Sequence, residues 1–254
     1  MSTSNFNRFA LVALLGLPAA VQAQVVSDLR GDWSDAMNPN GRWAYRQTST
    51  LLPSGTWSSD FAAQPAWVGA FPIMWLRAQS TAGFDVQVGD IVTHSSKDTA
   101  NLGNVIWTSP NNGTIDINGG VWMIRDIGRA NDWVLRKNGA LLSTGSLFSG
   151  DPYNRANPFN LDAGSGGALN AVAVSVGDQI ELSFLRISAN GDYNGVNFSV
   201  TLTTVPEPSS IILSSIALCG AFGPLCRRIR KRAVMPFEWR NCAGVVDDAA
   251  LDRG

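Results

Sequence analysis

Tryptophan offers the clearest binding chemistry in this chain. Eight of the nine tryptophans lie within residues 24–204: Trp33, Trp43, Trp57, Trp67, Trp75, Trp107, Trp122 and Trp133. An indole can stack on a sugar ring, but it also fills β-sandwich cores, where one ring buries up to about 250 Å². Trp107, Trp122 and Trp133 stand among strand-forming residues and are predicted to be core. Trp57 and Trp67, flanked by Ser, Gly and Pro, are the candidates for exposed glycan-stacking platforms, with packing in the core or at its rim as the alternative.

The acidic residues offer a second chemistry, because carboxylates and backbone carbonyls together hold Ca²⁺. Asp28, Asp32 and Asp35 lie close together near the N-terminus, and Asp192 falls in the oxygen-rich turn 190–195. Their spacing matches no EF-hand loop or other defined ligand set. We interpret them as solvated turn residues and predict no metal site and no cofactor, with a structural Ca²⁺ as the alternative.

Catalytic signatures are few. His94 is the only histidine in the chain, which excludes a metal centre or mechanism that needs two histidines. The sequence contains no Gly-x-Ser-x-Gly elbow, no His-Glu-x-x-His and no phosphate-binding glycine loop. It therefore predicts a protein that is not an enzyme. Two alternatives stay open: His94 in a Ser-His-Asp arrangement, and two carboxylates brought together in space as in a glycosidase.

The elements that must position these side chains are short β-strands. Segments rich in β-branched and aromatic residues, several of them alternating apolar with polar, predict strands at 105–108, 114–118, 121–125, 133–137, 171–176, 180–185 and 196–203. Turn residues separate them at 110–113, 118–120, 138–139, 177–178 and 190–192. No sustained helical pattern occurs in residues 24–204. Short strands at this spacing indicate an antiparallel sandwich or barrel, and we expect an all-β sandwich.

Three local features refine this expectation. Asn138-Gly139 is the strongest hairpin signal, because this pair suits the tight turn between two strands. Residues 86–90 and 174–178 share the pattern Val-x-Val-Gly-Asp and are predicted to be turns at equivalent edges of the sandwich. Residues 151–167 are rich in Asn, Pro and Gly and are predicted to be a loop.

Composition bounds the class of protein. Residues 24–204, about 180 residues, suit one domain with its own core. Their 11 Lys and Arg against 15 Asp and Glu leave a net charge of about −4, which argues against nucleic acid as a partner. All three cysteines (Cys219, Cys226 and Cys242) follow this region, so the domain is predicted to have no disulfide and no thiolate chemistry.

The N-terminus has the pattern of a secretory signal peptide. Arg8 precedes the apolar run 9–17, Pro18 ends that run, and small residues follow up to Ala23. We predict a signal peptide over residues 1–23, cleaved between Ala23 and Gln24. A first transmembrane anchor is the alternative, but the apolar run is too short to span a bilayer.

A membrane-length segment lies near the C-terminus. Residues 209–226 carry no formal charge and, at about 1.5 Å per residue, extend roughly 27 Å as a helix, enough for the hydrocarbon core of a bilayer. Two prolines precede the segment and stop a helix from running back into the domain. The basic cluster 227–232 should stay cytoplasmic, which places residues 24–204 outside. A buried core helix followed by a surface basic patch is the alternative.

This arrangement closely resembles the PEP-CTERM sorting signal, in which Pro-Glu-Pro is followed by a hydrophobic helix and an Arg-rich end. The match within residues 205–232 is carried by Pro206, Glu207, Pro208, Arg227, Arg228, Arg230, Lys231 and Arg232. The resemblance implies recognition by an exosortase, a membrane peptidase that cleaves near Pro-Glu-Pro, in a Gram-negative host that makes exopolysaccharide. Family members usually end just after the basic cluster, whereas this chain continues through residues 233–254. That stretch is expected to be a short, disordered cytoplasmic tail or an artefact of the gene model, because it is too short to fold alone.

The domain itself resembles a family of exported jelly-roll domains similar to carbohydrate-binding and galactose-binding sandwiches. The matching segments are 38–45, 107–114, 137–139 and 176–178. The resemblance implies a jelly-roll-like sandwich that recognises glycan.

The sequence thus predicts an exported, non-catalytic protein of the cell envelope. We expect it to be anchored in the inner membrane, or released to the extracellular matrix after exosortase processing, and to bind exopolysaccharide weakly. Its expected partners are the secretion machinery, the exosortase and polysaccharide, and not nucleic acid. The alternatives are a purely structural or adhesive surface protein without a small ligand, and a glycan-active hydrolase.

Overall fold

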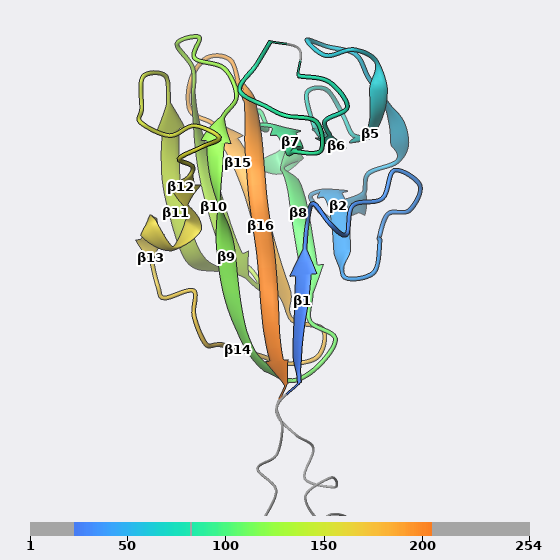
Figure 1. The fold of residues 1–254 in the computed structure, drawn as a ribbon, viewed down its shortest axis with the longest axis vertical. Coiled ribbons are helices and arrows are strands. Elements are labelled where there is room, and N and C mark those ends of the chain that lie inside the picture. Colours follow the sequence, from blue (N-terminus) through green and yellow to red (C-terminus); the bar gives the residue numbers. More distant parts are fainter. Residues whose placement is uncertain (1–22, 82, 205–254) are drawn as a thin grey trace, which may run out of the picture. The chain divides into compact units, whose positions relative to one another are not determined.

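Two antiparallel β-sheets packed face to face make up the domain (Figure 1). The computed structural model describes residues 23–81 and 83–204. The predicted all-β, antiparallel sandwich is confirmed, and the only helices in the described residues are two short 3₁₀ turns, η2 (Thr99–Asn101) and η3 (Leu161–Ala163). The predicted signal peptide, sorting signal and C-terminal tail lie outside the described residues. No helix within residues 23–81 and 83–204 has the length and apolar character needed to cross a membrane.

Sheet A has nine strands and sheet B has seven. Sheet A contains β1 (Gln24–Asp28), β4 (Ser54–Trp57), β5 (Gln64–Val68), β6 (Met74–Arg77), β7 (Ile91–His94), β9 (Gly113–Met123), β12 (Phe159–Asn160), β14 (Val172–Val174) and β16 (Tyr193–Thr204). Sheet B contains β2 (Trp43–Gln47), β3 (Thr50–Leu51), β8 (Gly103–Thr108), β10 (Ala130–Lys137), β11 (Ala140–Phe148), β13 (Ser165–Gly166) and β15 (Gln179–Arg186). The strand order is β12-β9-β16-β7-β6-β5-β4 in sheet A, with β1 against β16 and β14 against β9, and β13-β11-β10-β15-β8-β2-β3 in sheet B.

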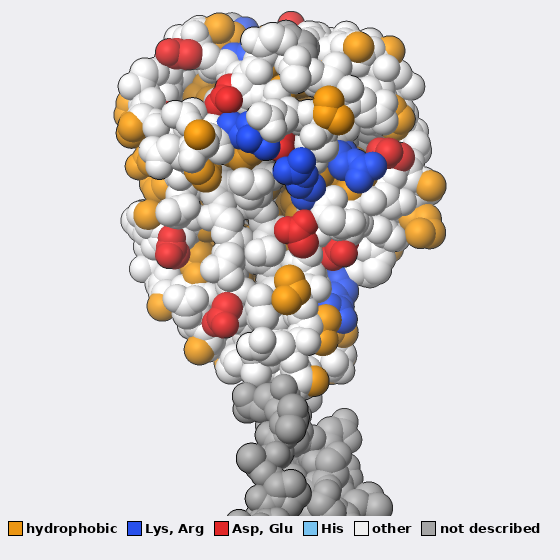
Figure 2. Space-filling view, in the orientation of Figure 1, with side chains coloured by type: hydrophobic (Ala, Val, Ile, Leu, Met, Phe, Trp, Pro, Cys, Tyr) orange, Lys and Arg blue, Asp and Glu red, His pale blue; other side chains and the backbone are white. Residues whose placement is uncertain are grey.

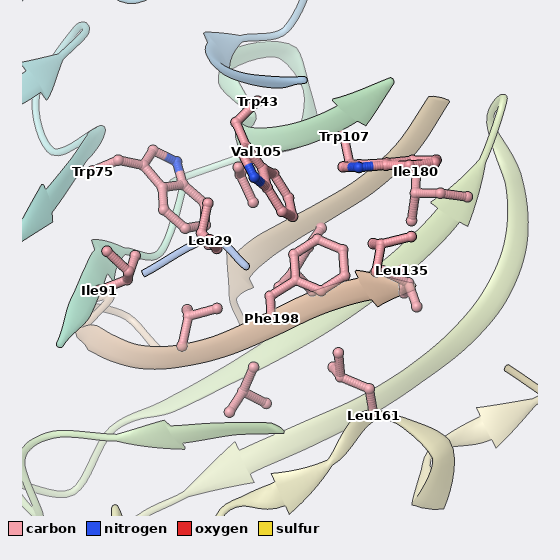
Figure 3. Close-up of a cluster of buried hydrophobic side chains, with 14 of the residues drawn as sticks. Leu29, Trp43, Trp75, Ile91, Val105, Trp107, Leu135, Leu161, Ile180 and Phe198 are labelled. Carbon is pink, nitrogen blue, oxygen red and sulfur yellow. The ribbon is translucent and has the colours of Figure 1, made fainter. Parts of the chain in front are cut away.

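The main core lies between the two sheets and is rich in tryptophan (Figure 3). All eight tryptophans of the domain are buried, so the prediction that Trp107, Trp122 and Trp133 are core is confirmed. Burying rings of this size removes much apolar surface from water, which is the main source of folding free energy in a domain without disulfides.

A second, smaller core covers the other face of sheet A. Neighbouring residues alternate between the two cores along β6 and β7: Trp75 and Ile91 belong to the main core, whereas Leu76 and Val92 belong to the second. Successive side chains of a strand point to opposite faces, so sheet A is buried on both sides there. The second core also holds Tyr193, the first residue of β16.

Strand β16 sets the long axis of the domain. It pairs with β9, β7 and β1, and Gln24 of β1 lies opposite Thr203. The described chain therefore begins and ends at one end of the sandwich, the lower pole in Figure 1. The opposite end, where β7, β9 and β15 stop and β10 and β16 begin, is called the upper pole below.

The later strands match the sequence-based expectation well. All seven predicted segments lie at least partly in observed strands, but 114–118 and 121–125 belong to one strand, β9, which ends at Met123, and 171–176 shortens to Val172–Val174. The expected loop at 151–167 is mostly irregular but contains the short elements β12, η3 and β13. The sequence did not predict β1 to β7, because these strands are only two to five residues long, too short for a clear period-two pattern.

The turn predicted at residues 118–120 is wrong. Strand β9 runs straight through it, with Gly119 opposite Phe198 of β16. Gly119 has a φ of +135°, and a Cβ built on it would lie 2.0 Å from the Asn197 carbonyl oxygen. The absence of a Cβ at Gly119 therefore allows two strand backbones to approach each other closely. A glycine can have this role within a strand as well as in a turn.

The predicted Asn138-Gly139 hairpin is confirmed between β10 and β11. Both residues have positive φ, 49° and 83°, as a two-residue hairpin turn with right-handed strand twist requires. The turn is tied to the neighbouring Gly177-Asp178 turn, because Asn138 Nδ2 donates to Asp178 Oδ1 at 2.8 Å and Lys137 Nζ lies 3.0 Å from Asp178 Oδ2.

The two Val-x-Val-Gly-Asp segments form the same turn, as predicted. Gly89 and Gly177 both have positive φ, 93° and 86°. In each turn the aspartate accepts a hydrogen bond from the backbone N–H three residues earlier, at 2.7 Å for Asp90 and 2.9 Å for Asp178. The first turn leads into β7 of sheet A and the second into β15 of sheet B.

The Asp178 turn predicts a defined acid sensitivity. The backbone hydrogen bond from Ser175, followed by those from Asn138 and Lys137, lowers the pKa of Asp178 from 3.8 to about 2. A carboxyl whose pKa is depressed on folding stabilises the fold above its unfolded pKa, and this contribution disappears as the pH falls through the folded pKa. We expect Asp178→Asn to be less stable than the parent at pH 5–7, with the difference shrinking toward zero near pH 2.

Urea midpoints of the 24–204 fragment, measured from pH 2 to pH 7, check this expectation. Asp126→Asn is the matched control, because Asp126 is exposed and makes no hydrogen bond or ion pair within the described residues. A pH-independent difference between Asp178→Asn and the parent would contradict the assigned role.

Candidate functional site

The two tryptophans predicted as exposed platforms are buried. Trp57 is 7% and Trp67 is 4% exposed, so that prediction is wrong for both. Trp67 belongs to the main core, stacks on Tyr45 and donates its Nε1–H to the Ser34 carbonyl at 3.1 Å. The small residues around both indoles allow the chain to fold closely over them. Small residues also occur in exposed loops, so the local sequence does not show whether such an indole is buried or exposed.

The N-terminal aspartates act as hydrogen-bond acceptors. Asp32 Oδ2 accepts from Trp43 Nε1 at 3.0 Å, Asp35 Oδ1 accepts from Trp33 Nε1 at 2.7 Å, and Asp28 Oδ1 accepts from the Gly31 N–H. These contacts orient core indoles and close a turn. Within residues 23–81 and 83–204, no group of three His, Cys, Asp or Glu side chains is placed to hold a metal ion.

A pocket of about 560 Å³ lies at the upper pole. This volume falls in the range of small-ligand sites, roughly 300–1,000 Å³. Its wall comes from five separate segments: the β4–β5 loop, the β5–β6 loop, the end of β7 with the residues after it, the β9–β10 loop, and the stretch from the end of β15 to the start of β16. The cationic residues that line it are Lys97, Arg125, Arg129 and Arg186.

The chain brings these segments together by crossing between the sheets. After β7, the Ser96 N–H donates to the Phe184 carbonyl at 2.8 Å, and the Arg186 N–H donates to the Ser96 carbonyl at 3.0 Å. These bonds join the end of β7 in sheet A to the end of β15 in sheet B. They also set Lys97, which follows Ser96, beside Arg186 on the pocket wall.

Arg125 links two carboxylates beneath the pocket. Its Nε donates to Asp192 Oδ1 at 2.6 Å, its Nη2 lies 2.5 Å from the same oxygen, and its Nη1 lies 3.3 Å from Asp60 Oδ2. The Asp192 side chain is fully buried, whereas that of Asp60 is 43% exposed. The guanidinium also lies over the rings of Phe84 and Tyr193, at 5.4 and 4.8 Å from their centroids. The cation is therefore held from several sides.

Tyr193 joins this charged cluster to an aromatic stack. Its hydroxyl lies 2.9 Å from the Ser59 carbonyl oxygen and accepts a hydrogen bond from Trp57 Nε1 at 3.1 Å. Burial raises the pKa of Tyr193, so the phenol stays neutral at pH 7. On the other side, Trp57 stacks parallel to Phe71, with ring centroids 5.9 Å apart and planes within 8°. Phe71 is 79% exposed and lines the pocket, so its ring is the aromatic surface that faces solvent there.

His94 lines the same pocket as a neutral ring. Its Nδ1 lies 2.9 Å from the Ser95 carbonyl oxygen. Because a carbonyl oxygen only accepts, Nδ1 carries the hydrogen and donates a hydrogen bond to it. Burial lowers the pKa of His94, against the opposing effect of that hydrogen bond. In a Ser-His-Asp arrangement the same nitrogen would donate to a carboxylate. The partner of Nδ1 here is instead a main-chain carbonyl.

The cations of the pocket differ in how well they are compensated. Arg129 Nη1 donates to the Gly191 carbonyl at 2.7 Å and lies 3.8 Å from Asp192. Lys97 and Arg186 make no side-chain hydrogen bond or ion pair within residues 23–81 and 83–204. Outside this pocket, Arg30 and Arg155 both pair with the buried Asp90.

On the face of the domain that Figure 2 shows, basic side chains are unevenly spread. In Figure 2 most of the Lys and Arg side chains on the visible face lie in its upper half. Because charges on a cleft wall focus the field inside it, the upper-pole pocket is a place where an anion would concentrate.

Sequence reasoning missed the residues that the fold gathers here. Phe71 had one signal, a large apolar residue between Ala70 and Pro72 in a turn-like stretch. Lys97 and Arg186 had none, because they are 89 positions apart and meet only through the crossing of the chain between the sheets. Asp192 was noted only as part of an oxygen-rich turn, and its ion pair with Arg125 was not foreseen.

The chain matches no family model and no curated protein sequence. Its class follows from the structure of the described residues, an all-β sandwich with a basic, aromatic-walled pocket at one pole.

The Arg125 cluster predicts unequal effects for its two carboxylates. Asp192→Asn removes a fully buried charge and leaves Arg125 uncompensated, which should lower the free energy of unfolding by about 3–5 kcal/mol. Asp60→Asn removes a partly exposed partner of the same guanidinium and should cost less than about 1 kcal/mol. Urea denaturation of the 24–204 fragment measures both. Equal losses would show that Asp192 does not organise the pole.

Proposed function

We propose that the chain is an exported protein of the cell envelope whose sandwich domain binds glycan at the upper pole. Export rests on the signal-peptide pattern of residues 1–23, and tethering rests on the resemblance of residues 205–232 to the PEP-CTERM signal. The chain leaves the described domain at Thr204, the end of β16 opposite Tyr193. Eleven residue steps at about 3.3 Å place these two ends roughly 36 Å apart. A tether that begins at residue 205 therefore starts at the pole remote from the pocket.

We infer that the sandwich is a jelly roll. Four strand positions in each sheet support this topology. In sheet A they are β7, β16, β9 and a fourth position that β12 and β14 share beside β9, and in sheet B they are β8, β15, β10 and β11. Along the chain, β7, β8, β9 and β10 alternate between the sheets, as do β14, β15 and β16. Two Greek keys wound in this way make a jelly roll, an architecture that lectin domains also use.

Glycan binding rests on one observation above all, the exposed Phe71 ring stacked on buried Trp57 at the pocket wall. A flat aromatic face can stack on the apolar face of a sugar, and packing on Trp57 holds Phe71 in a defined plane. Neighbouring polar groups from Asn190, Lys97 and Arg186 supply hydrogen bonds to hydroxyl and acid groups.

The alternatives fit the site less well. A glycosidase needs two carboxyls that reach the sugar, but Asp192 is fully buried and, like Asp60, is paired with Arg125. A purely structural surface protein gives no reason for an exposed aromatic ring and two cations without carboxylate partners among the described residues to line one pocket of small-ligand size.

Binding is tested with the 24–204 fragment, whose own first and last strands pair and whose core is internal. On a glycan array and in polysaccharide pull-downs, we expect Phe71→Ala to weaken binding at least about tenfold, as loss of a central aromatic contact does. Phe148→Ala is the matched control, since Phe148 is 53% exposed but lies outside this pocket. If a cooperatively folded fragment binds no glycan, or if both variants weaken binding equally, the proposed function is wrong.

Tethering is tested separately by fractionation. Expressed in a Gram-negative host without exosortase, the full chain should be found in the membrane fraction with residues 24–204 accessible to protease from outside. A chain that stops after Thr204 should be released. In a host with exosortase, the product should lose mass near Pro206-Glu207-Pro208. Recovery of the full, uncleaved chain in the released fraction of either host would refute the anchor.

A further inference from the structure

The charge of the upper-pole pocket is opposite to that of the domain. Four cations line it, Lys97, Arg125, Arg129 and Arg186, against two carboxylates, Asp60 on its wall and Asp192 beneath it. The difference is a local charge of +2. Residues 24–204 as a whole carry about −4, from 11 basic and 15 acidic side chains. More than a third of all the basic residues of the domain therefore converge on one pocket.

Two of the four cations are available to a ligand. Arg125 is held by both carboxylates, and Arg129 is partly held by Gly191 and Asp192. Lys97 and Arg186 have no carboxylate partner within the described part of the chain, and the Ser96 backbone bonds keep the two residues next to each other. Both cations line the same pocket, so one anion bound there would interact favourably with each of them.

The position of Arg186 explains why this charge faces the pocket. Along β15, Leu182 and Phe184 point into the main core, and Arg186 continues the same face two residues further on. Phe184 is the last residue of β15 in the main core, and the pairing of β15 with β10 stops at Asn131 opposite Arg186. The planar fork of a guanidinium there matches a planar, bidentate acceptor.

We infer that the ligand of this pocket is an acidic glycan, one whose sugars carry carboxylate groups as uronic acids do. The inference rests on the proposed glycan-binding function and names its substrate class. Lys97 and Arg186 would bind the carboxylate, with the Arg186 guanidinium able to meet both of its oxygens. Phe71 would stack on the ring of the same or a neighbouring sugar, and Asn190 would bond to its hydroxyls.

Other polyanions fit less well. Duplex nucleic acid presents rows of phosphates and binds proteins through extended basic surfaces, whereas this domain is acidic outside one pocket of about 560 Å³. A charged lipid surface is likewise flat and favours clusters of several basic residues with apolar anchors. A uronic acid combines one negative charge with a ring that can stack, which matches the cations and the exposed aromatic ring of this pocket.

The test uses the 24–204 fragment and calorimetric titration with short oligomers of three uronate polymers: polygalacturonate, alginate and hyaluronate. Each is compared with its carboxyl-reduced, neutral form. We expect at least one acidic oligomer to bind at least tenfold more tightly than its neutral form, and the difference to shrink in 0.5 M NaCl as screening increases. Arg186→Gln and Lys97→Gln should each weaken the binding of the acidic oligomer at least fivefold, and by more than they weaken the binding of its neutral form.

Arg136→Gln is the matched control. It removes one positive charge from the same sheet, on β10 opposite Glu181 and away from the pocket, and should change binding less than twofold. Circular dichroism and urea midpoints establish that each variant is folded.

The outcomes separate this inference from the proposed function. Equal affinity for acidic and neutral oligomers, with loss of both in Phe71→Ala, overturns the acidic ligand and leaves glycan binding in place. Tighter binding to a DNA duplex or to anionic vesicles than to any glycan overturns both. If the folded parent binds no oligomer, both proposals are also wrong. If Arg136→Gln loses as much acidic binding as Arg186→Gln does, the effect comes from overall charge, and the pocket is not the binding site.

Discussion

The pairing of β16 with its neighbours is the constraint on which the rest of the structure depends. This strand of 12 residues is hydrogen-bonded to β9 over 11 residue pairs, and also to β7 and β1. Because its inner face carries Val196, Phe198, Val200 and Leu202, it supports the main core over most of its length. Its two ends therefore define the two poles, with the chain leaving at one and the pocket at the other.

Buried charge organises the pocket end. Asp192 comes one residue before β16 and fixes Arg125, which in turn reaches Asp60 and packs on Tyr193. A buried ion pair contributes little net stability compared with apolar packing, but breaking it is costly, so it specifies one arrangement of loops. The sandwich holds a second hub of this kind at Asp90, where Arg30 and Arg155 meet. The hydrogen bond to Asp90 raises the pKa of Arg155 further above its already high ordinary value.

Local sequence patterns correctly predicted the turns whose conformation depends on only a few neighbouring residues. The Asn138-Gly139 hairpin and the two Gly-Asp turns formed as expected, because positive φ and Asp side-chain acceptors act within a few residues. The same reasoning failed at Asn118-Gly119-Gly120, where the glycine meets a neighbouring strand rather than a turn. It also failed for Trp57 and Trp67, because exposure depends on which distant segments fold over a side chain.

The sequence by itself determined the fold class, since period-two patterns and turn residues leave few alternatives to an antiparallel sandwich, and it indicated the segments proposed for export and anchoring. Only the tertiary structure decided the site. Phe71, Lys97 and Arg186 lie far apart in the chain and meet through strand order and the crossing after β7. Pairing between distant strands is set by the packing of the whole core, and no window of neighbouring residues contains that information.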